Sequence, residues 1–118
     1  MIKHLILVVN CDINLGQSIA LILHRAGYLP TIAQSACEAM RHIQSGDFRL
    51  VILDSNMDEI KMDLLPKILV GYPNLSILLM TDSPIPKMDQ ENQLLRAHYL
   101  EKPVGPERLL DYVEVILA

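Results

Sequence analysis

A chain of 118 residues with 51% hydrophobic residues predicts one domain, residues 1–118, whose core needs no metal or disulfide to hold it. The formal net charge of −4 gives no basic footprint, which argues against direct binding to nucleic acid or to an anionic membrane. The two cysteines, Cys11 and Cys37, form neither a CxxC nor a metal-ligand spacing, and no apolar run reaches membrane-spanning length, so we expect a cytoplasmic protein.

Strand and helix patterns alternate along the whole chain. Short apolar runs predict strands at residues 5–9, 29–33, 48–54, 75–80 and 98–102. Apolar residues at helical spacing predict helices between Asp12 and Gly27, after Ser35, and at residues 61–73, 86–97 and 105–118. This alternation favours an α/β fold with one parallel sheet and helices on both of its faces, because strand–helix–strand crossovers are right-handed.

Local signals mark several of the expected helix ends. Gly27 can adopt the left-handed conformation that ends the first helix. Ser35 can cap the second helix, and Glu38 stands three residues later, as in a capping box. Pro66 falls inside the helix expected at 61–73, where it should remove one hydrogen bond and bend the helix.

Polar side chains stand where the expected strands end, and in a parallel sheet these ends meet at one edge. They are Asn10, Cys11 and Asp12, then Asp54, Ser55 and Asn56, then Thr81, Asp82 and Ser83, and finally Lys102 and Pro103. The turn after the first strand has neither a GxGxxG nor a Walker A sequence, which argues against dinucleotides and nucleoside triphosphates as ligands. A carboxylate can attack phosphorus, while an ammonium and a hydroxyl can pair with phosphoryl oxygens, so this edge favours phosphoryl chemistry.

Four motifs in this order resemble the receiver domain of two-component response regulators, over essentially the full chain. They are LILVVNCD, LVILDSNM, ILLMTD and YLEKP. The resemblance implies that Asp54 is the phosphoacceptor and that Lys102 contacts the phosphoryl group. It further implies a switch hydroxyl at Thr81, a switch aromatic at Tyr99 and, usually, a cis bond before Pro103. The fold it implies is a flavodoxin-like, doubly wound sheet of five parallel strands in the order 2-1-3-4-5, with five helices.

The chain departs from the receiver pattern at the end of the first strand. The family carries two acids that hold Mg²⁺ where this chain has Asn10 and Cys11. Of the ligands that the resemblance implies, the Asp54 carboxylate and the Asn56 carbonyl remain. An amide is neutral and a thiol is a poor ligand for a hard cation, so we expect Mg²⁺ binding to be weak or absent.

Residues beside these positions have plainer interpretations. We expect Cys11 to be a small buried side chain rather than a metal ligand or redox group. Asp12 comes one residue late for the family's acidic pair, although its loop position could turn it inward as a ligand. Asp58 and Glu59 add carboxylates to the loop after the third strand, where they are solvated charges or partly replace the missing acids.

Three functional classes stay open. In the first, a histidine kinase or phosphotransfer protein phosphorylates Asp54, and Thr81 and Lys102 move inward to change a surface for a downstream protein or output domain. In the second, which the missing acids favour, a degenerate pseudo-receiver binds its protein partner without phosphorylation. The third, a phosphatase of the haloacid dehalogenase type, is disfavoured because those enzymes carry the nucleophilic Asp on their first strand. Pairing of two copies into a homodimer stays open as well.

Overall fold

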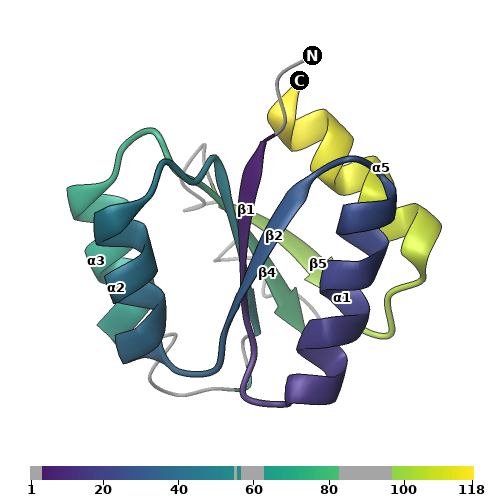
Figure 1. Ribbon diagram of the computed structural model, residues 1–118, viewed down its shortest axis with the longest axis horizontal. Coiled ribbons are helices and arrows are strands. Elements are labelled where there is room, and N and C mark those ends of the chain that lie inside the picture. The colour runs from purple at the N-terminus through teal and green to yellow at the C-terminus, as the bar shows by residue number, and fades with distance from the viewer. Residues whose placement is uncertain (1–3, 55, 57–62, 83–96) are drawn as a thin grey trace.

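The computed structural model describes residues 4–54, 56, 63–82 and 97–118. Its sheet consists of five parallel strands, β1 Leu5–Val9, β2 Leu29–Ala33, β3 Leu50–Asp54, β4 Ser76–Thr81 and β5 Ala97–Glu101. The strands lie in the order β2-β1-β3-β4-β5, which confirms the order that the family resemblance implies. The twisted sheet runs through the middle of the molecule (Figure 1), and its parallel strands all end at the same edge.

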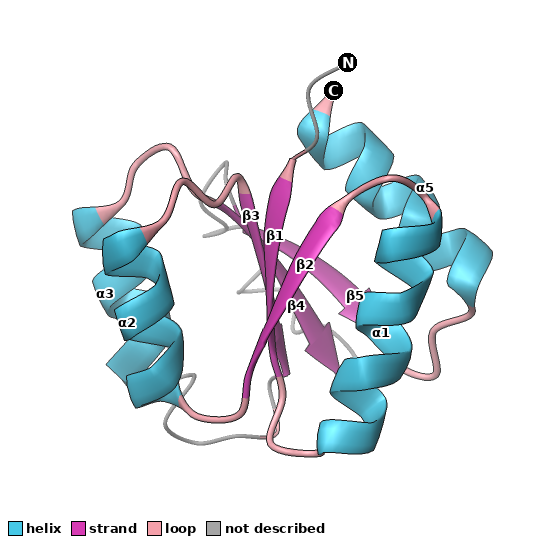
Figure 2. Cartoon of the chain, viewed as in Figure 1, coloured by secondary structure: helices cyan, strands magenta, loops and turns pink. Residues whose placement is uncertain are grey.

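Helices cover both faces of the sheet, as the alternating pattern predicts. Helices α1 Ile13–Arg25 and α5 Pro106–Leu117 lie on one face, and α2 Ala36–Ser45 and α3 Leu65–Gly71 lie on the other (Figure 2). The fourth of the five expected helices, residues 86–97, falls outside the described residues except at Ala97. That residue opens β5, so the expected helix is wrong there. No helix within the described part of the chain is both long and apolar enough to cross a bilayer.

The hydrophobic core has two layers, one on each face of the sheet. Leu7 and Val9 of β1 join the cluster that packs against α2 and α3. Ile6 and Val8 join the cluster against α1 and α5, because successive side chains of a strand point to opposite faces. Strand β3 is buried along its whole length between β1 and β4. The end of this central strand is therefore held by packing on both sides.

Several expected helix ends are found in the structure. Gly27 has a φ of +96°, which confirms its left-handed conformation after α1. Ser35 Oγ accepts the Glu38 N–H at 3.1 Å, which confirms the cap of α2, and the Glu38 carboxylate reaches back to the Gln34 N–H at 3.3 Å. Pro66 lies in the first turn of α3, and Asp63 and Leu64 before it are π-helical. The bend expected at this proline stays a prediction.

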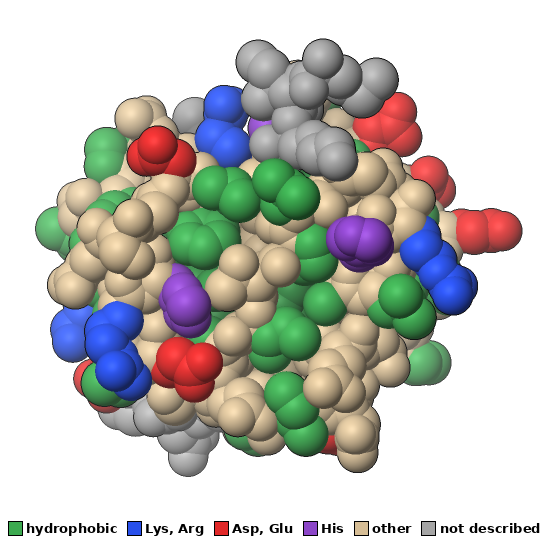
Figure 3. All heavy atoms as spheres, viewed as in Figure 1, with side chains coloured by type: hydrophobic (Ala, Val, Ile, Leu, Met, Phe, Trp, Pro, Cys, Tyr) green, Lys and Arg blue, Asp and Glu red, His purple; other side chains and the backbone are tan. Residues whose placement is uncertain are grey.

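Strand β2 is the outermost strand on one side of the sheet. Figure 3 shows the face of the molecule across which β2 runs. Pro30 is accommodated in β2 because an edge strand pairs on one side only. On this face apolar side chains lie between separate charged ones, and the Lys and Arg side chains do not gather into a patch. The edge strand is thus not flanked by a basic surface in this view.

Candidate functional site

Three strand ends build the candidate site. Asp54 is the last residue of β3, Thr81 is the last residue of β4, and Lys102 directly follows β5. Asp54 is paired with Met80 in the sheet, so Thr81 lies one residue further along the neighbouring strand. The Lys102 N–H donates to the Thr81 carbonyl at 2.7 Å, which ties the end of β5 to the end of β4. The peptide bond after Lys102 is cis, as the resemblance implies.

The Asp54 carboxylate and the Lys102 ammonium form an ion pair at this edge of the sheet. Lys102 Nζ lies 2.8 Å from Asp54 Oδ1, and the two side chains are only 16% and 8% exposed. The backbone N–H of Asn56 donates to the same carboxylate oxygen at 3.0 Å. Taking two charges out of water is costly, so a nearly buried pair is weak evidence for stability and better evidence for a functional site.

A second carboxylate, that of Asp82, lies at the mouth of the site. Asp82 Oδ1 is 3.9 Å from Lys102 Nζ, and Asn56 Nδ2 donates to Asp82 Oδ2. The Asp82 side chain is 55% exposed, so water screens its charge far more than that of Asp54. Sequence reasoning placed Asp82 among the strand-end residues without a role. The signal that could have found it is an acid directly after the strand-end hydroxyl residue Thr81.

The end of β1 uses its polar groups to start α1. Asn10 is 2% exposed, and its Oδ1 accepts the Asp12 N–H at 2.9 Å. Asp12 Oδ1 in turn accepts the N–H groups of Asn14 and Leu15 at 3.0 and 3.3 Å, which makes Asp12 the N-cap of α1. Cys11 is exposed, so the expectation of a buried cysteine is wrong. The strand ends at Val9, and the capping turn carries Cys11 past the edge of the sheet.

The two switch residues that the resemblance implies lie on neighbouring strands. Thr81 is half-buried at the end of β4. Tyr99 is half-buried in the middle of β5, where it is paired with Leu79 and packs against the core cluster next to α2 and α3. Tyr99 is therefore built into one core layer, whereas Lys102 reaches the edge. Asp58 and Glu59, the further carboxylates of the sequence, lie outside the described residues.

The donor groups that the structure describes fit Mg²⁺ poorly. Mg²⁺ prefers a set of hard oxygen ligands, usually with carboxylates among them. No three His, Cys, Asp or Glu side chains within the described ranges come together in a group that could hold a metal ion. The Asn10 amide oxygen is neutral and already accepts a hydrogen bond, and Cys11 offers a soft sulfur. Of the family's carboxylate positions, only Asp54 keeps its acid.

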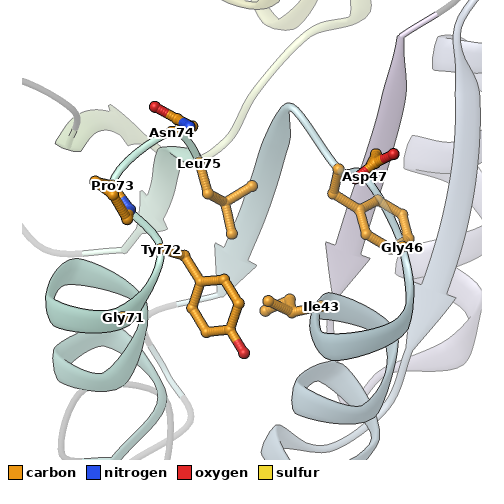
Figure 4. A pocket seen from close by; sticks show the side chains of 9 residues that line it. Ile43, Gly46, Asp47, Gly71, Tyr72, Pro73, Asn74 and Leu75 are labelled. Atoms are coloured by element: carbon orange, nitrogen blue, oxygen red, sulfur yellow. The ribbon is translucent and has the colours of Figure 1, made fainter.

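Two pockets, one at the carboxyl ends of the strands and one at their amino ends, differ in charge. A groove of about 580 Å³ runs between α1 and α5, and Lys102 and Asp82 line its polar end. The other pocket, of about 220 Å³, lies between the turns that follow α2 and α3 (Figure 4). There Tyr72 and Ile43 lie close together, and Asp47 is the one charged residue of the described lining. Opposite charges thus meet at the carboxyl ends of the strands and not in the pocket at their amino ends.

Known proteins resemble this chain in sequence and in fold. The DNA-binding transcriptional regulator NtrC of Rhizobium meliloti (strain 1021) is 39% identical over 77 residues, which are 64% of this chain and 16% of that protein. The structure of the chemotaxis response regulator CheY4 of Vibrio cholerae superposes with a TM-score of 0.86 at 27% identity, over 98% of this chain and 99% of that chain. The response regulator protein TrrA of Thermotoga maritima, solved in complex with Mg(2+)-BeF, gives 0.82 at 25% identity, over 97% and 99%.

A family match covers the same elements. The model of the response regulator receiver domain matches residues 6–114. That range begins in β1, ends in α5 and includes the strand ends that carry Asp54, Thr81 and Lys102. The match therefore spans both core layers and the whole candidate site. The chain belongs to the response regulator receiver family of two-component signalling.

Proposed function

We propose that this receiver accepts a phosphoryl group on Asp54 from a histidine kinase or phosphotransfer protein in the cytoplasm. The observation that supports this most is the nearly buried Asp54 carboxylate, which Lys102 Nζ contacts at 2.8 Å and the Asn56 N–H contacts at 3.0 Å. These contacts orient the Asp54 carboxylate at the carboxyl ends of the strands, where a phosphoryl donor can approach. The cation for this carboxylate comes from the end of β5, two positions away in the sheet, so the pair joins separate strand ends.

The chemistry is a phosphoryl transfer to a carboxylate. A carboxylate oxygen of Asp54 forms a bond to the phosphorus of phosphohistidine, the P–N bond breaks, and its electron pair stays with the leaving imidazole. The product is an acyl phosphate on Asp54. The Lys102 ammonium, already beside the acceptor, can pair with a phosphoryl oxygen, and the Thr81 hydroxyl can donate to another. Both groups would thereby stabilise the negative charge of the transferred group.

The same residues can carry the signal away from the site. Lys102 is joined to Thr81 by a backbone hydrogen bond of 2.7 Å, so a new partner for the ammonium acts on the ends of both β4 and β5. Tyr99 lies on β5 and packs into the core next to α2 and α3. Phosphorylation would shift an existing equilibrium between two arrangements of these strand ends, and a downstream protein or output domain would bind one of them.

We expect the sequence of this receiver to lower its affinity for Mg²⁺. In a receiver with both acids the ion offsets the negative charge of acceptor and donor. Here Asp54 and the Asn56 carbonyl are the groups that would hold it, and Asn10 and Cys11 supply no charge. We therefore propose that the Lys102 ammonium balances most of the negative charge in this site, and we expect weak Mg²⁺ binding.

A second candidate function is that of a pseudo-receiver, which binds its protein partner whether or not Asp54 is modified. The observation that favours it is the neutral, hydrogen-bonded Asn10 and the exposed Cys11 at the end of β1. The intact pair of Asp54 and Lys102 favours the first candidate.

Incubation of the purified chain with acetyl phosphate, followed by intact mass spectrometry, tests the proposal. We expect a species heavier by one phosphoryl group, and we expect Asp54→Asn to remove it completely because an amide is not a nucleophile toward phosphorus. Asp47→Asn is the matched control, since Asp47 lies in the pocket at the opposite edge. Absence of the heavier species from the parent and from the control would favour the pseudo-receiver.

A further inference from the structure

The contact between Asp82 and Lys102 gives the site a feature that its phosphoryl chemistry does not need. Asp82 is the first residue after β4, and its two carboxylate oxygens face different strands. Oδ2 accepts the Asn56 side-chain N–H beyond the end of β3, and Oδ1 lies 3.9 Å from Lys102 Nζ beyond the end of β5. One side chain thus connects the ends of the two strands that flank β4.

This bridge sets a negative charge where a phosphoryl donor must approach. Asp54 is 8% exposed and Asp82 is 55% exposed, so Asp82 lies on the solvent side of the shared lysine. The described charges of the site are two carboxylates and one ammonium, which leaves one excess negative charge. An entering phosphoryl group is an anion, so it meets repulsion from Asp82 and competes with it for Lys102.

We propose that Asp82 is a gating residue, whose carboxylate limits the access of anionic phosphoryl groups to Lys102 and Asp54. Asn56 holds the carboxylate across the mouth of the site through its side-chain amide. On the β1 side Asn10 and Cys11 add no charge, and the Asp12 carboxylate caps α1. Asp82 is thus the exposed carboxylate that the described residues place beside Lys102. The consequence for phosphorylation rests on the proposed function of Asp54, but the consequence for anion binding does not.

Asp82→Asn is the most direct variant, because asparagine keeps the shape of the side chain and an acceptor oxygen for Asn56 while it removes the charge. We expect inorganic phosphate, titrated against the parent and the variant and followed by the Lys102 amide in a two-dimensional NMR spectrum, to bind the variant about three- to tenfold more tightly. The gain should shrink as sodium chloride is added, since Asp82 is exposed and salt screens it. A purely structural role would not produce this salt dependence.

Asp47→Asn is the matched control, with the same change of net charge at the opposite edge of the sheet. We expect its phosphate affinity to equal that of the parent. Equal affinities of the parent and Asp82→Asn, or an equal gain in Asp47→Asn, would overturn the gate. Both variants replace exposed side chains, and a dispersed amide spectrum verifies that each is folded.

Phosphorylation by acetyl phosphate, measured on the same three proteins, separates the gate from the proposed function. Faster labelling of Asp82→Asn than of the parent supports both. If no protein is labelled while Asp82→Asn binds phosphate more tightly, the gate stands and the proposed function fails. If all three are labelled at the same rate and bind phosphate equally, the gate fails and the proposed function stands.

Discussion

The two sides of the candidate site lie at the same edge of one sheet, but their polar residues do different things. At the end of β1, Asn10 and Asp12 hydrogen-bond within the turn that starts α1. At the ends of β3 and β5, Asp54 and Lys102 reach across strands to each other. The contrast teaches that a place at the strand ends is not sufficient for a role in the site. In this turn Asp12 caps α1 and Asn10 accepts the Asp12 N–H, so the hydrogen bonds of both side chains hold the turn.

Charge follows the same division. At the end of β1 a neutral amide and a thiol stand in place of two acids, and the Asp12 carboxylate caps α1, while the remaining side carries Asp54, Lys102 and Asp82. A receiver with both acids would hold negative charge on the β1 side as well and would need a cation to balance it. In this chain the Lys102 ammonium pairs directly with the Asp54 carboxylate. Variants that remove charge from one side or add it to the other test this division.

The largest expected effect is on stability, from breaking the pair of Asp54 and Lys102. Lys102→Met leaves the nearly buried Asp54 carboxylate without its cation, which should lower the free energy of unfolding by about 2 kcal/mol. Asp54→Asn should lower it less, because Asp82 still lies 3.9 Å from the lysine. Urea denaturation of the three proteins measures both values. Equal losses, or a larger loss for Asp54→Asn, would contradict the assigned arrangement of charges.

Placing acids at the end of β1 should lower the free energy of unfolding and strengthen Mg²⁺ binding. The double variant Asn10→Asp with Cys11→Asp places a carboxylate at a position that is 2% exposed, close to the described site, and should lose about 1–2 kcal/mol of unfolding free energy without metal. Added Mg²⁺ should raise its melting temperature and speed its phosphorylation by acetyl phosphate, because an ion bound only to the folded state stabilises it.

The parent and Cys11→Ser serve as controls for that variant, and Mg²⁺ should leave the melting temperatures of both nearly unchanged. Tight, saturable shifts of amides near Asp54 in the parent on titration with Mg²⁺ would show that the β1 acids are not needed for metal binding.

Asp12 offers a test of the capping role. Asp12→Ala removes the oxygen that accepts the Asn14 and Leu15 N–H groups, which should cost about 1 kcal/mol of unfolding free energy. Asp12→Asn keeps a capping oxygen and should cost much less. Neither variant should change the rate of phosphorylation. A slower rate in Asp12→Asn with unchanged stability would return Asp12 to the site as a ligand.

The smallest expected effect concerns His98 of β5, whose pKa is lowered by burial. The folded state therefore binds a proton less readily than the unfolded state, whose histidine titrates near 6.5. Stability is full above that pH and falls slightly as the pH drops below it. His98→Gln should remove this small loss, as thermal unfolding at pH 7.5 and 5.5 can measure. A fall of equal size in the variant would assign the loss to other groups.

The strands were predictable because the signals are local and repeated. Apolar runs such as Leu5–Val9 define buried strands, and right-handed crossovers restrict how they can be arranged. The meeting of Asp54 with Lys102 follows from the same logic, since both stand at strand ends of one parallel sheet. The family resemblance then supplied the strand order.

The failures depend on contacts that no single segment encodes. Cys11 was expected to be buried because free cysteines usually are, but the Asp12 cap turns the chain outward. The contact of Asp82 requires the loops after three strands to be placed together, which a linear pattern does not specify.

The most direct test of the central claim is to locate the phosphoryl group itself. After incubation with acetyl phosphate, reduction with borohydride converts an acyl phosphate of aspartate into homoserine, and peptide mass spectrometry identifies the residue. The account predicts conversion at Asp54 and at no other acid, with Asp12 and Asp82 unmodified. Conversion at Asp82 or Asp12 in place of Asp54, or a phosphoryl group that resists reduction, would contradict it.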